Sequence, residues 1–170
     1  PLAALGIPEK VVNSNIKWRS PSSDFCEKIA EFSKKFSTKN PYKFLKILCE
    51  GDGSKRLPIK LPKDGEPVFF PKTDTVIGVI GLSCLGKPIK ETLFRYELLP
   101  NLTSLDNYFI KSLQSADIVT TDFLYRLCLS EKGLRKNITS QKFCIIFNQA
   151  DILDEKALAE VITLRNQLQT

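Results

Sequence analysis

Three short apolar runs constrain the fold of this chain more than any other feature. They span residues 44–49, 75–81 and 142–147 and read FLKILC, TVIGVIG and KFCIIF. Apolar runs of roughly four to eight residues that end in turn residues are typical of strands in a parallel sheet, because such strands are covered on both faces. Segments with helical patterning separate and follow the runs. Their order predicts an α/β protein.

Helical periodicity is clearest after Ser22. Phe25, Ile29, Phe32 and Phe36 recur at spacings of three and four residues, and polar residues that suit an N-cap precede them. This pattern predicts an amphipathic helix whose aromatic stripe belongs to the core. Further helices are predicted over residues 104–114, 120–129 and 155–168, and a loop with short structured pieces is predicted over residues 1–20.

The length and composition bound the class of protein. At 170 residues, of which 42% are hydrophobic and 26% charged, the chain is predicted to form a single domain over residues 1–170. No apolar run approaches the roughly 20 residues of a membrane helix, and no signal peptide opens the chain. We therefore expect a cytoplasmic protein without a membrane partner. Because the sequence begins at Pro1 and contains no methionine, we also expect it to be incomplete at its N-terminus.

Charge and cysteine usage exclude several classes of function. A net charge of +6 favours anionic partners such as nucleotides, but the basic residues, Lys136 among them, are scattered and predict a solvated surface rather than a nucleic-acid interface. The absence of histidine and of C-x-x-C pairs argues against a zinc site. Cys49 and Cys144 lie in apolar runs and are predicted to be buried thiols. Cys84 follows a strand and is the thiol to test for reactivity, although packing is the favoured role.

Acidic residues follow the first apolar run. Glu50, Asp52 and Gly53 stand where a parallel strand delivers ligands to the edge of a sheet, and carboxylates there suit a Mg²⁺ ion bound to a nucleotide. The alternative is a tight turn, since Asp-Gly is also a turn dipeptide. The loop that follows, residues 54–72, is unusually long and carries Lys60 among several basic residues. It would either grip phosphates or lie exposed in solvent.

The segment after the second run approaches a phosphate-binding loop without completing it. Residues 81–88 read GLSCLGKP, against the pattern G-x-x-x-x-G-K-S/T. Pro88 offers neither the hydroxyl that binds Mg²⁺ nor a backbone N–H for a phosphate. We therefore interpret the segment as a strand-to-loop junction that presents a useful cation, Lys87.

The third run ends in a sequence that suits recognition of a nucleotide base. Asn148-Gln149-Ala150-Asp151 is similar to the Asn-Lys-x-Asp of guanine-nucleotide proteins, in which the carboxylate accepts the two N–H groups on the Watson–Crick edge of guanine. Gln149 replaces the lysine whose stem packs on the base. The alternative is a helix cap, because Asp151 and Asp154 precede the last predicted helix.

Taken together, five segments resemble one family. They read ILCEGDGSKRLPIKLPKDGEPVFFP, TVIGVIGLSCLGKPI, FRYE, LSEKGLRKN and CIIFNQADIL. In this order they resemble, over about residues 46–153, the selenium-dependent hydroxylase accessory proteins, which are called YqeC-like. The resemblance implies a three-layer, P-loop-like nucleotide-binding fold with a mostly parallel sheet flanked by helices, and a role in the maturation of selenium-dependent molybdenum hydroxylases.

The resemblance also implies roles for individual residues. The positions that match the family's motifs are Glu50, Asp52, Lys60, Glu66, Lys87, Arg95, Glu97, Asn148 and Asp151. We expect Asp52 and Glu50 to serve Mg²⁺ and the attacking water of a possible NTPase. Gly53, Lys60, Lys87 and Arg95 are expected to bind the anionic groups of a nucleoside triphosphate, and Asn148 and Asp151 its base. A molybdenum hydroxylase or its maturation factors are the expected protein partners.

The chain departs from the family pattern at three places. Residues 1–40 hold no counterpart of the family's glycine-rich phosphate loop, Ser83 stands where the family tends to have aspartate, and Phe94 and Tyr96 replace the residues beside Arg95. The sequence therefore supports an alternative from another class. In that alternative the chain is a non-catalytic scaffold that binds a protein partner and retains a degenerate nucleotide site.

Overall fold

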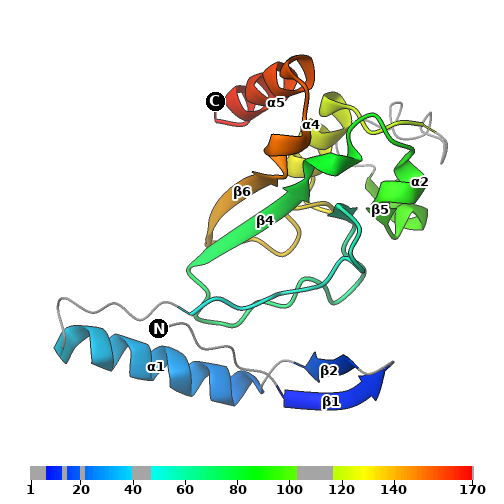
Figure 1. Ribbon diagram of the computed structural model, residues 1–170. Helices are drawn as coiled ribbons and strands as arrows, with labels where there is room; N and C mark the ends of the chain where they lie inside the picture. Colours follow the sequence, from blue (N-terminus) through cyan, green and yellow to red (C-terminus); the bar gives the residue numbers. More distant parts are fainter. Residues whose placement is uncertain (1–6, 13–14, 20–21, 40–46, 103–116, 170) are drawn as a thin grey trace. The chain divides into compact units, whose positions relative to one another are not determined.

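The computed structural model describes residues 7–12, 15–19, 22–39, 47–102 and 117–169. The chain divides into two compact units. The N-terminal unit comprises residues 1–49 and 69–73, and the main unit comprises residues 50–68 and 74–170. Figure 1 shows the elements of both units, which we describe one at a time. The prediction of a single domain stays a prediction.

The N-terminal unit contains a pair of strands and one long helix. Strands β1 (Ile7–Val12) and β2 (Asn15–Arg19) pair antiparallel, where the sequence predicted only a loop with short pieces. The short pieces are present, but the sequence did not identify their pairing, because antiparallel pairing is made by backbone groups and needs no clear hydrophobic alternation. Helix α1 (Ser23–Lys39) is confirmed, with Ser22 Oγ accepting a hydrogen bond from the Phe25 N–H at 3.3 Å.

Two aromatic residues of α1 that the sequence assigned to the core are not buried. Phe25 and Phe32 are both exposed. Helical spacing fixes only that apolar side chains share one face of a helix, and it does not specify that another element covers that face.

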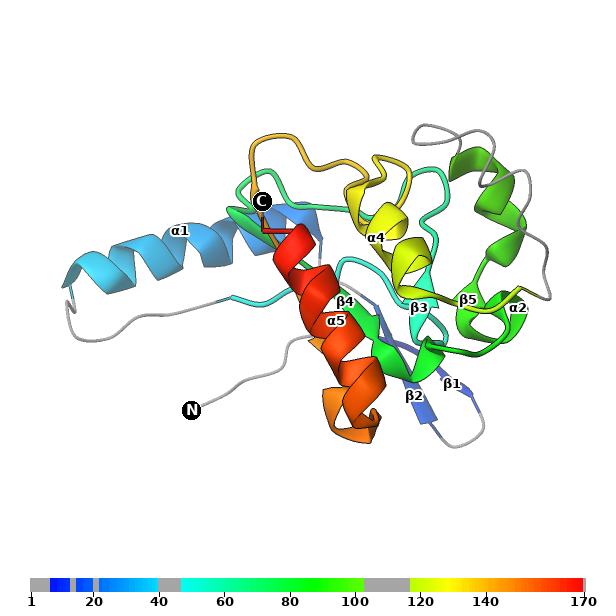
Figure 2. The same ribbon diagram turned by 90° about the horizontal axis from the view of Figure 1, so that it is seen from above.

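The main unit is built on two parallel strand pairs. Strands β4 (Thr75–Gly81) and β6 (Lys142–Asn148) pair in continuous register from Thr75↔Lys142 to Gly81↔Asn148, and their arrows run side by side in Figure 1. Strands β3 (Ile59–Lys60) and β5 (Leu93–Phe94) form a second, much shorter parallel pair, which is visible in Figure 2. The second and third apolar runs are therefore confirmed as parallel strands.

The first apolar run is not a strand where the structure describes it. Ile47, Leu48 and Cys49 have no regular secondary structure, and Leu48 is 84% exposed. An apolar run becomes a buried strand only when a neighbouring strand pairs with it. Cys49 instead ends the N-terminal unit, and Glu50 begins the main unit. Residues 44–46 lie outside the described part.

The core of the main unit gathers where β4 meets the helices. Short helix α2 (Ile89–Thr92), helix α4 (Thr121–Leu129) and helix α5 (Glu155–Gln167) contribute to it, together with the 3₁₀ turns η1 (Leu82–Cys84) and η2 (Tyr96–Leu102). Residues with essentially no exposed surface include Ile80, Leu82, Ile89, Leu124 and Leu127. The predictions of α4 and α5 are confirmed; the helix predicted over residues 104–114 lies outside the described residues.

Side-chain hydrogen bonds and one glycine fix the ends of these helices. Thr120 Oγ1 accepts from the Phe123 N–H at 3.1 Å, and Asp154 Oδ1 accepts from the Ala157 N–H at 2.8 Å, so each side chain caps a helix. The chain after α4 turns back so closely that a Cβ on Gly133 would lie 2.5 Å from the Leu127 carbonyl oxygen. Only glycine fits at that position.

Among the described residues, those on one face of the β4–β6 pair are partly exposed. Ile77, Val79 and Ile146 alternate with less exposed neighbours, and each has about half of its surface exposed to solvent. The sequence predicted strands buried on both faces, so this part of the prediction was wrong. Apolar composition reports what a strand is able to bury, whereas coverage depends on which elements pack against it.

The observed class is α/β, with helices, 3₁₀ turns and short parallel strands in small sheets. Among the described helices, none combines the length and the apolar character needed to cross a membrane.

Candidate functional site

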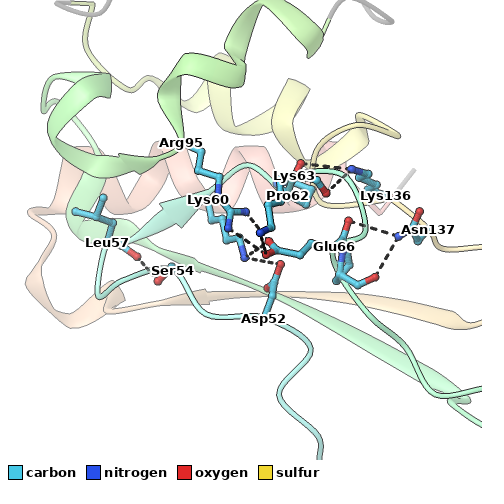
Figure 3. A network of polar contacts seen from close by, with 11 residues as sticks. Asp52, Ser54, Leu57, Lys60, Pro62, Lys63, Glu66, Arg95, Lys136 and Asn137 are labelled. Atoms are coloured by element: carbon cyan, nitrogen blue, oxygen red, sulfur yellow. Dashed lines mark hydrogen bonds and ion pairs between the residues drawn. The ribbon is translucent and has the colours of Figure 1, made fainter. Parts of the chain in front are cut away.

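Four side chains that the sequence singled out meet in one ion network, which we define as Asp52, Lys60, Glu66 and Arg95. Lys60 Nζ lies 2.7 Å from Asp52 Oδ2 and 2.7 Å from Glu66 Oε2. Arg95 donates from both terminal nitrogens to the two Glu66 oxygens, at 2.5 and 3.0 Å. Figure 3 shows Lys60 and Arg95 reaching the Glu66 carboxylate, and Asp52 in contact with Lys60. This bidentate contact is the strongest geometry an arginine offers a carboxylate.

The short parallel pair of the main unit places the two cations of the network. Lys60 in β3 is the register partner of Phe94 in β5, and the Leu61 N–H donates to the Phe94 carbonyl oxygen at 3.1 Å. Arg95 follows directly in the left-handed region, with a φ of 65°. Left-handed backbone is unfavourable for arginine, so the network and the strand pair together hold the residue in this conformation.

The network is sheltered from solvent, and this changes its electrostatics. The side chains of Lys60, Arg95 and Glu66 are 10%, 16% and 19% exposed. The pKa of Glu66 is lowered from 4.5 to about 2, mainly by the hydrogen bond from Arg95 and then by Lys60, while burial opposes the shift. The same hydrogen bond raises the pKa of Arg95. Glu66 is therefore ionised throughout the neutral and mildly acidic range.

Lys136 and Asn137, which follow α4 in the sequence, hold the loop that carries Glu66. Lys136 Nζ donates to the Lys63 carbonyl oxygen at 2.7 Å, and Asn137 Nδ2 donates to the carbonyl oxygens of Glu66 at 3.4 Å and Pro67 at 3.1 Å. The sequence placed Lys136 among scattered surface cations and did not single out Asn137. The one available signal was the asparagine itself, since Asn137 has a φ of 62° and asparagine tolerates that region.

The acidic residues after the first apolar run fit Mg²⁺ only in part. Asp52 is already paired with Lys60. Glu50 is exposed, and its Oε1 would lie 3.6 Å from a Cβ added at Gly53. Within the described residues, no group of three or more acidic or cysteine side chains stands ready to hold a metal. Mg²⁺ commonly binds one or two carboxylates and takes its other ligands from water and phosphates. Asp52 fits that use if a ligand supplies the remaining oxygens.

The first half of the segment from Gly81 to Pro88 is packed into the core, whereas a phosphate loop would be open. Leu82 and Cys84 have no exposed surface, and burial raises the pKa of the Cys84 thiol to about 11. A Cβ on Gly81 would lie 2.9 Å from Gln149 Oε1 and 2.9 Å from Pro58 Cβ, so this glycine allows close packing. The segment is thus a strand-to-loop junction, and Lys87 is exposed at its end.

The base-recognition motif begins at the last residue of β6. Asn148 Oδ1 accepts a hydrogen bond from the Gln149 N–H at 2.9 Å, and Gln149 adopts a left-handed φ of 66°. Asp151 lies in the 3₁₀ turn η3 (Ala150–Ile152) and is exposed. Asp154, not Asp151, caps α5. The alternative that these aspartates serve as helix caps therefore explains Asp154 but gives Asp151 no role.

The exposure of the cysteines differs from prediction at two positions. Cys84 and Cys128 are buried, and burial raises their pKa values to about 11 and about 12, so the packing role of Cys84 is confirmed. Cys49 and Cys144 are exposed, whereas the sequence predicted buried thiols. Cys144 lies on the partly exposed face of β6, and Cys49 lies outside any strand.

Comparison with known proteins gives one match. The family model described as YqeC protein matches residues 8–97, just over half of the 170 residues. This range includes the whole ion network and the junction after β4. No curated protein and no solved structure matches the chain.

Proposed function

The chain belongs to the YqeC protein family, and on that basis we propose that it is a cytoplasmic accessory protein in the maturation of selenium-dependent molybdenum hydroxylases. We propose further that it acts by binding a nucleoside triphosphate with Mg²⁺, on a three-layer P-loop-like scaffold. In this proposal the nucleotide-bound protein engages a molybdenum hydroxylase or one of its maturation factors.

One observation carries the nucleotide proposal. The carboxyl ends of β4 and β6 stand side by side, since Gly81 is the register partner of Asn148. Pro58, two residues before Lys60, packs against Gly81, and its carbonyl oxygen accepts from the Gly81 N–H at 2.8 Å. The basic loop and the base-recognition motif therefore approach the same end of a parallel pair. In open α/β sheets, ligands bind beyond the carboxyl ends of the strands.

The chemistry of the side chains suggests a role for each. Asp52 would hold Mg²⁺, whose positive charge would displace Lys60 from that carboxylate. Glu50 is exposed and would orient the water in a hydrolytic reaction. Asn148 and Asp151 would bind the base.

The cationic roles follow from exposure and pairing. Lys87 is exposed and would reach an anionic group of the nucleotide directly. Lys60 and Arg95 are held by Glu66, so their charges would act from fixed positions. Gly53 would allow the backbone to approach a phosphate.

Calorimetric titration of the chain with GTP and with ATP, each with and without Mg²⁺, tests this proposal. We expect Mg²⁺-dependent binding that favours GTP, and we expect Asp52→Ala to abolish the Mg²⁺ dependence. The matched control is Asp64→Ala, because Asp64 lies in the loop that follows β3 and its side chain is fully exposed. Absence of binding to either nucleotide by folded protein would overturn the proposal.

A second candidate function rests on the partly exposed face of the β4–β6 pair. Ile77, Val79 and Ile146 expose apolar surface on a parallel pair, a kind of sheet that is usually covered on both faces. Together with the buried junction after β4, this favours a non-catalytic module that binds a protein partner. In that case Val79→Lys would abolish binding to the hydroxylase, and Asp52→Ala would leave it unchanged. If both variants bind the hydroxylase normally, this candidate fails.

A further inference from the structure

A tight turn next to the ion network carries two cations in a strained conformation. The Ser54–Leu57 turn is closed by a hydrogen bond from the Leu57 N–H to the Ser54 carbonyl oxygen at 3.0 Å. Its central residues, Lys55 and Arg56, have φ values of 53° and 66°, as in a type I′ turn. That turn strongly prefers Asn-Gly, and a long side chain at positive φ is unfavourable.

A side-chain contact stabilises the turn against this strain. Ser54 Oγ donates to the Leu57 carbonyl oxygen at 2.7 Å, which adds a second bond across the turn. Figure 3 shows Ser54 and Leu57 at one side of the ion network. Strained backbone that the surroundings hold in place is concentrated at functional sites, and the backbone of Lys55 and Arg56 is held in this way.

The turn and the network share one aromatic side chain. Lys55 Nζ lies 5.1 Å from the centre of the Phe94 ring, Lys60 Nζ lies 5.9 Å from it, and Arg95 Cζ lies 4.6 Å from it. Three cations therefore surround one ring. Each gains a cation–π contact, but the contacts neutralise no charge.

The two groups of cations differ in their carboxylate partners. Lys60 and Arg95 are compensated by Asp52 and Glu66. Within the described part of the chain, neither Lys55 nor Arg56 forms an ion pair, and both are exposed. The surplus positive charge of this region is therefore concentrated at the tip of the turn.

We propose that the Ser54–Leu57 turn is a binding site for a polyphosphate group, which Lys55 and Arg56 contact directly. The inference rests on the proposed function and refines it, because among the basic residues of the loop at residues 54–72 it assigns the phosphate contacts to Lys55 and Arg56 in particular. Lys60 and Arg95 are positioning residues in this arrangement, since they hold β5 and the Phe94 ring on which Lys55 lies.

The position of the turn suits this role. Pro58 follows the turn directly and packs on Gly81 at the carboxyl end of β4. A phosphate chain held by the turn would therefore lie at the edge of the sheet that also carries Asn148 and Gln149. Arginine and lysine bind phosphate through charge-assisted hydrogen bonds, and both side chains of the pair are exposed to solvent.

The double substitution Lys55→Asn/Arg56→Gly tests the site without disturbing the fold. It removes both charges and installs the residues that this turn prefers, so we expect the melting temperature to rise by roughly 2–5 °C. We expect the affinity for tripolyphosphate and for Mg²⁺–GTP to fall about 30- to 100-fold, as for the loss of two charge-assisted contacts. The control is Lys132→Asn/Lys156→Gln, which removes two exposed charges elsewhere in the main unit.

The outcomes separate the inference from the proposed function. If the unaltered chain binds Mg²⁺–GTP and the double variant binds it equally well, the inference is overturned and the proposed function stands. If the unaltered chain binds tripolyphosphate but no nucleotide, and the double variant loses this binding, the inference stands and the nucleotide proposal fails. If the unaltered chain binds neither, or the control loses as much affinity as the double variant, the inference is overturned.

Discussion

The ion network and the Ser54–Leu57 turn lie within a few residues of each other but treat charge in opposite ways. In the network, Glu66 is sheltered and receives hydrogen bonds from Arg95 and Lys60. In the turn, Lys55 and Arg56 are exposed and sit on unfavourable backbone. In the ion network, opposite charges compensate each other, whereas the turn holds two positive charges next to each other.

The difference separates stability from binding. A sheltered, mutually paired charge is costly to remove singly, because its partner is left unsatisfied. An exposed cation on strained backbone contributes little to the folded state and is free to contact a ligand. The network residues that match family motifs are therefore expected to dominate stability, and the turn is expected to dominate anion affinity.

The largest expected effect comes from breaking the network. Glu66→Ala leaves Lys60 and Arg95 without their shared carboxylate, so we expect the free energy of unfolding to fall by about 2–4 kcal/mol. Urea unfolding followed by circular dichroism measures it. Asp64→Ala is the matched control, because Asp64 is fully exposed and lies 3.7 Å from Lys136 Nζ. It should cost less than about 0.5 kcal/mol, and equal losses in the two variants would refute the contrast.

The pH dependence of stability tests the same group by another route. Because the pKa of Glu66 in the folded chain is about 2, against 4.5 ordinarily, its stabilisation is fully present above about pH 4.5 and is lost as the pH falls toward 2. We expect about 2 kcal/mol from it, after allowance for partial exposure. The measurement is unfolding between pH 2 and 7, compared with Glu66→Gln. Glu31, whose pKa Lys72 also lowers, cancels in the comparison. Parallel profiles for the two proteins would contradict the assignment.

Much of the secondary structure could be predicted, because local patterns determine it. The apolar runs at residues 75–81 and 142–147 form β4 and β6, and the helices predicted over residues 120–129 and 155–168 are α4 and α5. The sequence did not predict which apolar residues are buried. Leu48 is exposed and outside any strand, and Ile77 and Val79 of β4 are about half exposed, because burial depends on partners far away in the sequence.

The sequence predicted which residues form the candidate site better than it predicted how they contact one another. Family motifs selected Asp52, Lys60, Glu66 and Arg95, and the structure brings these four together. No pattern indicated that they pair with one another, since ion pairing between distant residues leaves no local signal. The left-handed Lys55 and Arg56 were equally hidden, because their sequence is not that of a type I′ turn.

A smaller effect is expected at the residue that holds the Glu66 loop. Asn137→Ala removes two side-chain hydrogen bonds and places alanine at a φ of 62°, so we expect a loss of about 2 kcal/mol. Asn137→Gly keeps the backbone favourable and removes only the hydrogen bonds, for a loss of about 1 kcal/mol. Urea unfolding of both variants separates the contribution of the Asn137 hydrogen bonds from that of its backbone conformation. If glycine costs as much as alanine, backbone conformation is not part of the role of Asn137.

The smallest expected effect has the opposite sign. Arg56→Gly removes a charge from the turn and relieves the left-handed strain of about 1–2 kcal/mol, while the added freedom of glycine in the unfolded chain offsets part of the gain. We expect a net stabilisation of about 0.5–1 kcal/mol. Lys132→Gly is the control, because Lys132 is exposed and outside the positive-φ region, so glycine there should destabilise. If Arg56→Gly destabilises as well, then Arg56 contributes to folding, and the division between a stabilising network and a binding turn does not hold.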